Sequence, residues 1–544
     1  MKTCEFKIEG MTCDHCAVSI QNKLVENNGI YKSIARFEKS NAIVFFDESV
    51  IDENKISNII DSIGNYKVIK TSIVNEKAEE KHLIIIGGGS AAFAATIQAN
   101  ELGVKVTMVN DGLKIGGTCV NVGCVPSKNL IRAAETLHKS NNIPFDGIKS
   151  SAKVGSFSSL IEEKRKLVID LREQKYINII KDMDNFESIE GHAKLKSSNS
   201  IEINGQTIVG THILIATGAS AIIPKINGLN QVNYLTNEEA FELETLPKSI
   251  IVLGGSYIAL EMAQLFSRLG TKVTILQRSS QILSKEDSSI GNEISKHLKE
   301  EGIDIITNNQ FKQINENNGQ ISVLSNINGE DKIFNAEKIV IATGRKANSS
   351  NMNLEDIEVS LNQNGSIKVN EFLQTSIDTI YAAGDVLGSN MFVYTAAYEG
   401  KLAVNNMFTN DKKETDFRVL PWVIFTDPQI AGVGFDEEQA RENGINTDIA
   451  ILPLSHVPRA IAAKDTKGFI KLIRNIDDDT LVGARVVAPE GSELLMEISM
   501  AIQFKIKVSD LKELFHPYLT LSEGIKLAAI TFGKDVKKLS CCAT

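Results

Sequence analysis

The chain has 544 residues, of which 42% are hydrophobic and 23% charged, and its formal net charge is −10. This length exceeds what one hydrophobic core supports, so several domains are expected. The acidic balance argues against binding to nucleic acid, whose phosphates require a basic surface. Neither a long unbroken apolar run nor the apolar core of a secretory signal is present, so a cytoplasmic protein without a membrane span is expected.

Residues 1–70 have the apolar pattern of a small ferredoxin-like βαββαβ sandwich. The expected elements are all short: strands at 5–8, 34–37, 42–46 and 66–69, and helices at 17–25 and 56–63. The stretch 71–81, TSIVNEKAEEK, is mostly polar and charged and is expected to be a linker.

Cys13 and Cys16 form a C-x-x-C pair before the first expected helix. Two thiolates on one exposed edge suit a soft ion such as Hg(II) or Cu(I), and they leave room for a third thiol to take the ion over. Cys4 is expected to be a strand residue, and His15 a spacer facing solvent. The segment 10–16, GMTCDHC, resembles the heavy-metal-associated domain, which implies that the pair binds metal.

Two later stretches, 83–109 and 250–276, share a strand–glycine–helix–strand pattern. This pattern predicts two Rossmann-like dinucleotide-binding domains, with a pyrophosphate at each helix N-terminus. Small residues stand at the positions of close backbone approach and helix packing: Gly87, Gly89 and Ala92 in the first copy, and Gly254, Ser256 and Ala259 in the second.

The second strands of the two copies end without the usual acidic residue. Asn110 stands at the end of this strand in the first copy, and the sequence leaves undecided whether its side chain bonds a ribose hydroxyl. Gln277 and Arg278 stand at the second end, and an arginine can pair with a 2′-phosphate that a carboxylate would repel. NADPH is therefore favoured over NADH, with a solvated surface arginine as the alternative.

Three further strand ends fit a bound flavin: 215–218, 341–345 and 381–385. Asp385 follows the last of these strands and could hold a ribityl hydroxyl. The candidate cofactor contacts in these turns are Thr217, Gly218, Gly344 and Asp385. After residue 417 the pattern predicts an additional α+β domain.

The segment 116–128, GGTCVNVGCVPSK, contains Cys119 and Cys124. It resembles the active-site motif of the FAD-dependent pyridine nucleotide–disulfide oxidoreductases, and the resemblance extends over residues 81–544. It implies one FAD per subunit, NADPH as electron donor and a homodimer with the active site shared between subunits. The implied division is a first FAD-binding part at 82–235, an NADPH-binding domain at 236–346, a second FAD-binding part at 347–416 and a dimerisation domain at 417–544.

The same resemblance assigns roles to single residues. Cys124 is expected against the flavin and Cys119 toward the substrate, with both thiols acidified near a helix N-terminus. Lys128 and Glu261 resemble an ion pair beside the flavin, and Tyr257 resembles the ring over the nicotinamide site. Cofactor contacts are also implied for two residues of the motif, Gly117 and Thr118.

The C-terminal part distinguishes among members of this family. Tyr518 stands five residues before Glu523, where disulfide reductases carry an acid–base histidine that metal reduction does not need. The tail contains Cys541 and Cys542 and resembles that of members that reduce Hg(II). His516 departs from the family pattern, and acid–base chemistry, metal binding and a surface position all remain open for it.

Together these features predict reduction of Hg(II) by NADPH in mercury detoxification. The ion would be passed from Cys13 and Cys16 through the tail to the central pair. The alternatives are a dihydrolipoamide dehydrogenase-like disulfide reductase with a fused metal-binding domain, and a copper carrier whose flavin part keeps its thiols reduced.

Overall fold

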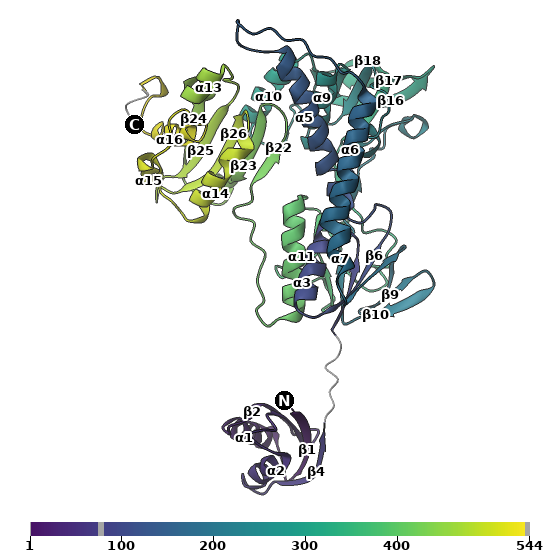
Figure 1. Cartoon of the computed structure of the whole chain (residues 1–544), viewed down its shortest axis with the longest axis vertical. Coiled ribbons are helices and arrows are strands. Elements are labelled where there is room, and N and C mark those ends of the chain that lie inside the picture. The colour runs from purple at the N-terminus through teal and green to yellow at the C-terminus, as the bar shows by residue number, and fades with distance from the viewer. Residues whose placement is uncertain (1, 74–80, 539–544) are drawn as a thin grey trace. The chain divides into compact units, whose positions relative to one another are not determined.

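The structure is a computed structural model and describes residues 2–73 and 81–538. The chain divides into two compact units, Met1–Lys81 and His82–Thr544 (Figure 1). Within the described ranges, no helix has both the length and the apolarity needed to cross a bilayer.

The first unit is an antiparallel sheet of order β2-β3-β1-β4 with two helices packed on it, and the predicted βαββαβ order is confirmed. In β1, every second side chain is buried, which places Cys4, Phe6 and Ile8 in the core with the helices. β4 continues through the first three residues of the segment expected to be a linker. The elements are β1 (Lys2–Glu9), α1 (Asp14–Val25), β2 (Ile30–Arg36), β3 (Asn41–Phe46), α2 (Glu53–Asp61) and β4 (Lys67–Ile73).

The second unit begins with a parallel sheet of order β21-β11-β5-β6-β7. Its central strand is an apolar run with both faces covered, as parallel sheets require. Strands β5 (His82–Ile86), β6 (Lys105–Asn110), β7 (Phe186–Glu190) and β11 (His212–Ile215) are joined by β21 (Ile380–Ala382), which returns from far along the chain. The first predicted dinucleotide-binding unit is therefore confirmed.

Helices cover this sheet and carry the motif of Cys119 and Cys124. Helix α11 packs beside α3 (Figure 1) so closely that a Cβ on Gly400 would lie 2.1 Å from the carbonyl oxygen of Ala91. The helices are α3 (Ser90–Glu101), α4 (Gly117–Asn121), α5 (Cys124–Asn141), α6 (Phe157–Arg172), α7 (Asn178–Lys181) and α11 (Val393–Phe408). A small antiparallel sheet is formed by β8 (Lys194–Ser197), β9 (Ser200–Ile203) and β10 (Gln206–Val209).

The second dinucleotide-binding unit repeats the arrangement with a parallel sheet of order β15-β14-β13-β19. Its strands are β13 (Ser249–Leu253), β14 (Lys272–Leu276), β15 (Asp304–Ile306) and β19 (Lys338–Ile341), and its helices are α8 (Asn237–Ala240), α9 (Tyr257–Leu269) and α10 (Ser288–Glu300). An antiparallel sheet of β16 (Asn309–Asn317), β17 (Gln320–Ile327) and β18 (Glu330–Ala336) is inserted before β19. Strands β12 (Ala219–Ala221) and β20 (Arg345–Ala347) form a two-stranded antiparallel sheet that connects the two dinucleotide-binding units.

The last domain is an antiparallel sheet of order β22-β23-β26-β25-β24, in agreement with the predicted α+β pattern. Helices pack on one face of this sheet, and Lys471 and Arg485 are buried on the opposite face. The strands are β22 (Trp422–Ile424), β23 (Gln429–Gly434), β24 (Thr447–Pro453), β25 (Phe469–Asn475) and β26 (Leu481–Ala488). The helices are α12 (Glu437–Glu442), α13 (Pro458–Ala463), α14 (Leu495–Gln503), α15 (Val508–Glu513) and α16 (Glu523–Ile530).

Candidate active site

The turn from β5 to α3 leaves backbone donors open at the start of α3. Gly87 has a φ of +126°, and a Cβ there would lie 2.1 Å from the carbonyl oxygen of Ala216. A Cβ on Gly117 would lie 2.6 Å from the Cα of Gly89, and Gly89 begins α3 without a side-chain cap. Side chains at these positions would fill the cradle, so the glycines fit a pyrophosphate held by the helix N-terminus.

Asp385 lies just beyond β21, at the carboxyl end of the same sheet. Burial raises the pKa of its carboxyl group, with Arg345 opposing, and neither oxygen has a hydrogen-bond donor among the described residues. Beneath it, Glu399 accepts a 2.6 Å hydrogen bond from the N–H of Gly384, and burial raises the pKa of Glu399 to about 7. An acceptor left open in a sheltered position fits a polyol hydroxyl of FAD.

The other expected cofactor contacts divide into groups. Ala92 and Thr118 lie on α3 and α4, and Ala92 is fully buried. The hydroxyl of Thr217, just before β12, donates to the carbonyl of Asn348, just after β20, at 2.6 Å, and thereby joins the two segments. Gly218 precedes β12 and Gly344 precedes β20, and both have positive φ.

Asn110 lies at the end of β6, and the sequence left undecided whether its side chain contacts a ribose. Its amide nitrogen donates to the carbonyl of Leu113 at 2.8 Å. Its Oδ1 lies close to Gly88, at 2.5 Å from the position of a Cβ there. The side chain therefore braces the loop, and this use of its donor could not be inferred from the sequence.

Cys119 lies in α4, and Cys124 is the first residue of α5, with both thiols free. The Cys119 thiol donates a hydrogen bond to Cys124, which together with Lys128 lowers the pKa of Cys124 to about 7 against the effect of burial. The same hydrogen bond and burial raise the pKa of Cys119, so the expectation that both thiols are acidified is wrong for Cys119, because its thiol is the donor of that hydrogen bond. Near neutral pH the pair therefore holds one thiolate and one thiol that supports it.

Lys128 lies one helical turn after Cys124 and pairs with Glu261 of α9, at 2.7 Å between Nζ and Oε2. The ammonium group lies 4.6 Å from the ring centre of Phe425. The second oxygen of Glu261 accepts the Phe425 N–H at 2.9 Å. A helix from each dinucleotide-binding unit and Phe425 of the dimerisation domain thus meet beside the cysteine pair.

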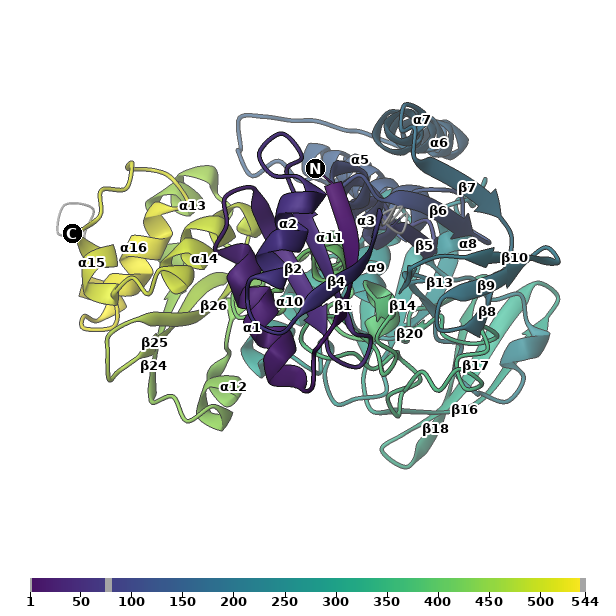
Figure 2. The same ribbon diagram turned by 90° about the horizontal axis from the view of Figure 1, so that it is seen from below.

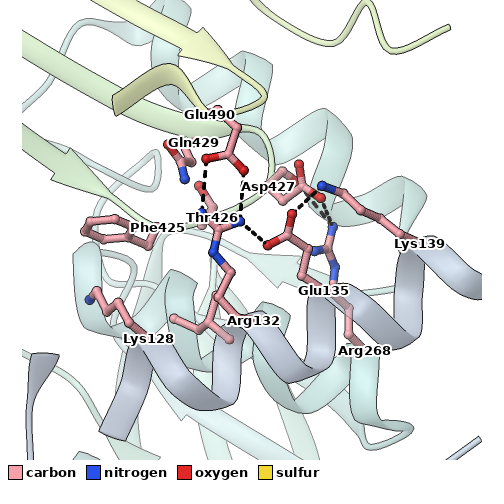
Figure 3. A pocket seen from close by; sticks show the side chains of 11 residues that line it. Lys128, Arg132, Glu135, Lys139, Arg268, Phe425, Thr426, Asp427, Gln429 and Glu490 are labelled. Carbon is pink, nitrogen blue, oxygen red and sulfur yellow. Dashed lines mark hydrogen bonds and ion pairs between the residues drawn. The ribbon is translucent and has the colours of Figure 1, made fainter. Parts of the chain in front are cut away.

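An ion-pair network fixes the remainder of α5 (Figure 3). Arg132 donates both guanidinium nitrogens to Glu490, at 2.9 and 3.0 Å, and one of them also to Glu135 at 2.7 Å. Arg268 bridges Glu301 and Asp427, and its side chain is only 3% exposed. The helix that begins at the redox pair is thereby held against the dimerisation domain.

Tyr394, at the start of α11, is a neighbour of the pair that sequence reasoning missed. Burial and the charge of Cys124 raise the pKa of Tyr394 to about 12. Its hydroxyl donates to the carbonyl of Pro421, and its ring stacks on Phe392 with 5.3 Å between centroids. The available signal was an aromatic pair shortly after Asp385, but the electrostatic influence of Cys124 on Tyr394 depends on the fold.

The second dinucleotide-binding unit, here called the nicotinamide unit because the sequence predicts NADPH there, has a glycine cradle like that of the first. A Cβ on Gly254 would lie 2.2 Å from the carbonyl oxygen of Ala342, and Ser256 begins α9 without capping it through its side chain. Ala259 is fully buried, and Tyr257 is the first helical residue. Arg278 lies just after β14 and is exposed, as a contact to a nucleotide phosphate requires.

In the N-terminal unit, Cys13 precedes α1 and Cys16 lies in its first turn, with 3.7 Å between the sulfur atoms. A hydrogen bond from Tyr66 is the main cause that lowers the pKa of Cys16 to about 6, and Thr12 adds to it. Tyr66 was not singled out from the sequence, since it lies 50 residues from Cys16. His15 is exposed and Cys4 is fully buried, so both occupy the kind of position that was expected.

Replacing Tyr66 by phenylalanine is expected to raise the pKa of Cys16 above 6, because the thiolate loses its strongest hydrogen-bond donor. The rate of Cys16 alkylation in the full chain, followed by peptide mass spectrometry against pH, should rise at higher pH than in the native protein. Tyr31→Phe is the control, since Tyr31 bonds Asp47 instead. Identical profiles for Tyr66→Phe and the native chain would contradict the assignment.

Tyr518 lies between α15 and α16 and is 57% exposed. Figures 1 and 2 both place this segment at the end of the dimerisation domain remote from α5. The His516 imidazole is not at the surface: its side chain is 5% exposed and bonds Glu497 at 2.7 Å. Cys541 and Cys542 lie outside the described residues.

No group of three or more His, Cys, Asp or Glu side chains suited to a metal ion occurs within 2–73 and 81–538. Cys13 with Cys16 and Cys119 with Cys124 each offer two sulfur atoms, a number of ligands that Hg(II) and Cu(I) accept.

Comparison with known proteins agrees with this geometry. Residues 81–400 match the pyridine nucleotide-disulphide oxidoreductase family, 420–529 its dimerisation domain and 5–67 the heavy-metal-associated domain. Among solved structures, the HOCl-induced flavoprotein disulfide reductase RclA from Escherichia coli superposes with a TM-score of 0.75 at 29% identity, covering 83% of this chain and all of that one. The chain belongs to the pyridine nucleotide-disulphide oxidoreductase family, which implies FAD and a nicotinamide nucleotide.

Within this family, the chain is similar to several mercuric reductases, two of them over all or nearly all of its length, and it groups with them. The mercuric reductase of Staphylococcus aureus is 40% identical over 543 residues, 98% of both chains. That of Lysinibacillus sphaericus is 39% identical and covers all of both chains. That of Streptomyces lividans is 40% identical over 85% of this chain and 98% of its own.

Proposed function

We propose that this chain reduces Hg(II) to Hg(0) with NADPH. The observation that carries the proposal is the Cys119–Cys124 pair with an acidified thiol, in a chain 40% identical along its length to a mercuric reductase. NADPH gives up two electrons and leaves as NADP+ and a proton, and Hg(II) takes up the two electrons. The neutral atom has little affinity for thiolate and departs.

The residues around the pair have distinct tasks in this proposal. The glycine cradle and Asp385 would hold FAD, which would supply two-electron transfer between the nicotinamide and the cysteines. Cys124 and Cys119 bind Hg(II) through their sulfur atoms. Lys128 keeps Cys124 ionised, and Glu261 keeps Lys128 in position.

Delivery of the ion proceeds by thiol exchange, which changes no oxidation state. Hg(II) passes from Cys13 and Cys16, or from small thiols, to the tail thiols Cys541 and Cys542 and then to the central pair. Each incoming thiol adds to a two-coordinate ion before an old ligand leaves. Cys16 presents a thiolate to the ion at neutral pH, because its pKa is lowered to about 6.

A homodimer completes the site in this proposal. The dimerisation domain exposes Met496, Phe504 and Phe515, at 60%, 69% and 100%, which a second copy can cover. Tyr518 and the tail of one subunit would then serve the cysteine pair of the other.

Two finer points follow the chemistry of the residues. Arg278 favours NADPH over NADH, since its charge complements a 2′-phosphate. The reaction needs a compartment where thiols remain reduced, as in the cytoplasm.

The decisive experiment is anaerobic NADPH oxidation by the full-length flavoprotein with Hg(II) and excess thiol, with mercury vapour trapped downstream. One Hg(0) is expected for each NADPH consumed. A disulfide reductase is the second candidate because RclA, 29% identical, is one. Rapid reduction of glutathione disulfide or lipoamide without mercury release would favour it, and metal transfer without NADPH consumption would favour a copper carrier.

A further inference from the structure

The only tryptophan of the chain, Trp422, begins β22 of the dimerisation domain and contacts the nicotinamide unit. Its indole stacks on the ring of Tyr257, with centroids 5.8 Å apart and planes inclined by 13°. Tyr257 opens α9 directly after the second glycine cradle. A residue of one domain thus covers one face of a ring in another.

The sheet is built to let the indole lie flat. Trp422 pairs with Gly432 on β23, and Gly432 pairs with Arg485 on β26, so the three form a row across the sheet. A Cβ on Gly432 would lie 2.5 Å from Cζ2 of the indole. The guanidinium group of Arg485 lies 5.6 Å from the indole centre, within the range of cation–π attraction.

Glu286 closes the arrangement from the loop before α10. It accepts a hydrogen bond from Arg485 Nε at 3.3 Å and one from the Tyr257 hydroxyl at 3.4 Å. Arg485 is 2% exposed, so its charge needs this carboxylate. Tyr257, Trp422, Arg485 and Glu286, here named the Trp422 cluster, form a closed circuit of contacts.

We propose that Trp422 is a positioning residue that fixes Tyr257 at the wall of the nicotinamide site, so that the dimerisation domain takes part in nucleotide binding. The inference rests on the proposed function, and within it on the place over the nicotinamide site that the family resemblance implies for Tyr257. The stack holds one face of the phenol ring, and Glu286 holds its hydroxyl. A ring ordered in advance costs less to immobilise when the nucleotide binds.

Trp422 reports on this arrangement because no other residue shares its fluorescence. In the full-length flavoprotein, Tyr257→Leu should shift its emission to longer wavelength, since the indole loses its cover. Phe417→Leu is the control, because it breaks the Tyr398–Phe417 pair elsewhere. An unchanged emission spectrum in Tyr257→Leu would overturn the stack.

Binding tests the function of the stack without any mercury. Calorimetric titration with NADP+ should give a Kd raised about two- to tenfold in Trp422→Leu, the range expected for loss of one aromatic pair. Gly432→Ala, which displaces the indole, should have the same effect, and Trp422→Phe, which keeps a stacking ring, should restore the native Kd. A native Kd in Trp422→Leu would overturn the proposal.

The two proposals can fail separately. NADP+ affinity and indole emission do not depend on what finally receives the electrons. A chain that releases no mercury vapour but loses NADP+ affinity in Trp422→Leu would remove the proposed function and leave the positioning role intact.

Discussion

Replacing Cys124 by alanine is expected to lower NADPH-driven mercury release by about a thousandfold or more, as removal of one member of a catalytic unit does. Cys124 is the more acidic thiol of the pair, with a pKa of about 7, and in the variant Cys119 alone remains to bind the ion. The measurement is trapped mercury vapour per NADPH under anaerobic conditions.

Two controls separate lost chemistry from lost structure. Reduction of the bound flavin by NADPH, followed by its absorbance, should persist in Cys124→Ala because the nucleotide side is untouched. Cys4→Ala removes a cysteine from the N-terminal core and should keep near-native mercury release. Near-native release by Cys124→Ala would contradict the assigned site.

Replacing Lys128 by methionine is expected to raise the pKa of Cys124 by about one unit, the lower end of the effect of a neighbouring opposite charge. The native pKa of about 7 is depressed, so thiolate is present above pH 7 and lost below it. In the variant, the rising limb of the pH–rate profile should move upward by the same amount. At pH 7 the thiolate fraction would fall about fivefold.

The same change leaves Glu261 unpaired where its side chain is only 10% exposed. A stability loss of about 1–3 kcal/mol is expected, below the full cost for a buried pair because Lys128 is one-third exposed. Lys139→Met on the same helix is the matched control, since Lys139 is 53% exposed. A pH profile unchanged in Lys128→Met would contradict the electrostatic role.

Much of the fold was accessible from local pattern. The runs LIII and IIVL, each followed by glycines and a helical stretch, predicted both parallel sheets because a buried strand and a phosphate-binding turn have strict local requirements. The alternating β1 pattern likewise predicted the N-terminal sheet, and the structure confirms it.

What the sequence did not predict are interactions between distant residues. The Tyr257–Trp422 stack joins residues 165 positions apart, and the charge of Cys124 acts on Tyr394 across 270 positions of the chain. The hydrogen bond from Asn110 to Leu113 is local, but the sequence equally allowed the Asn110 side chain to bond a ribose hydroxyl. The surroundings of Tyr518 in the proposed dimer depend on a second chain and follow from neither sequence pattern nor one subunit.

The buried thiol of Cys4 bears on how a carrier of thiophilic metal avoids being poisoned by it. Its side chain is fully buried and donates a hydrogen bond to Glu53, and burial raises its pKa, so it presents a neutral sulfhydryl. An ion could reach that sulfur only by opening the small sandwich. In this domain Cys13 is exposed and Cys16 is partly exposed, so their sulfur atoms are accessible to an ion, whereas the buried sulfur of Cys4 packs in the core. Solvent exposure therefore separates the two roles of cysteine.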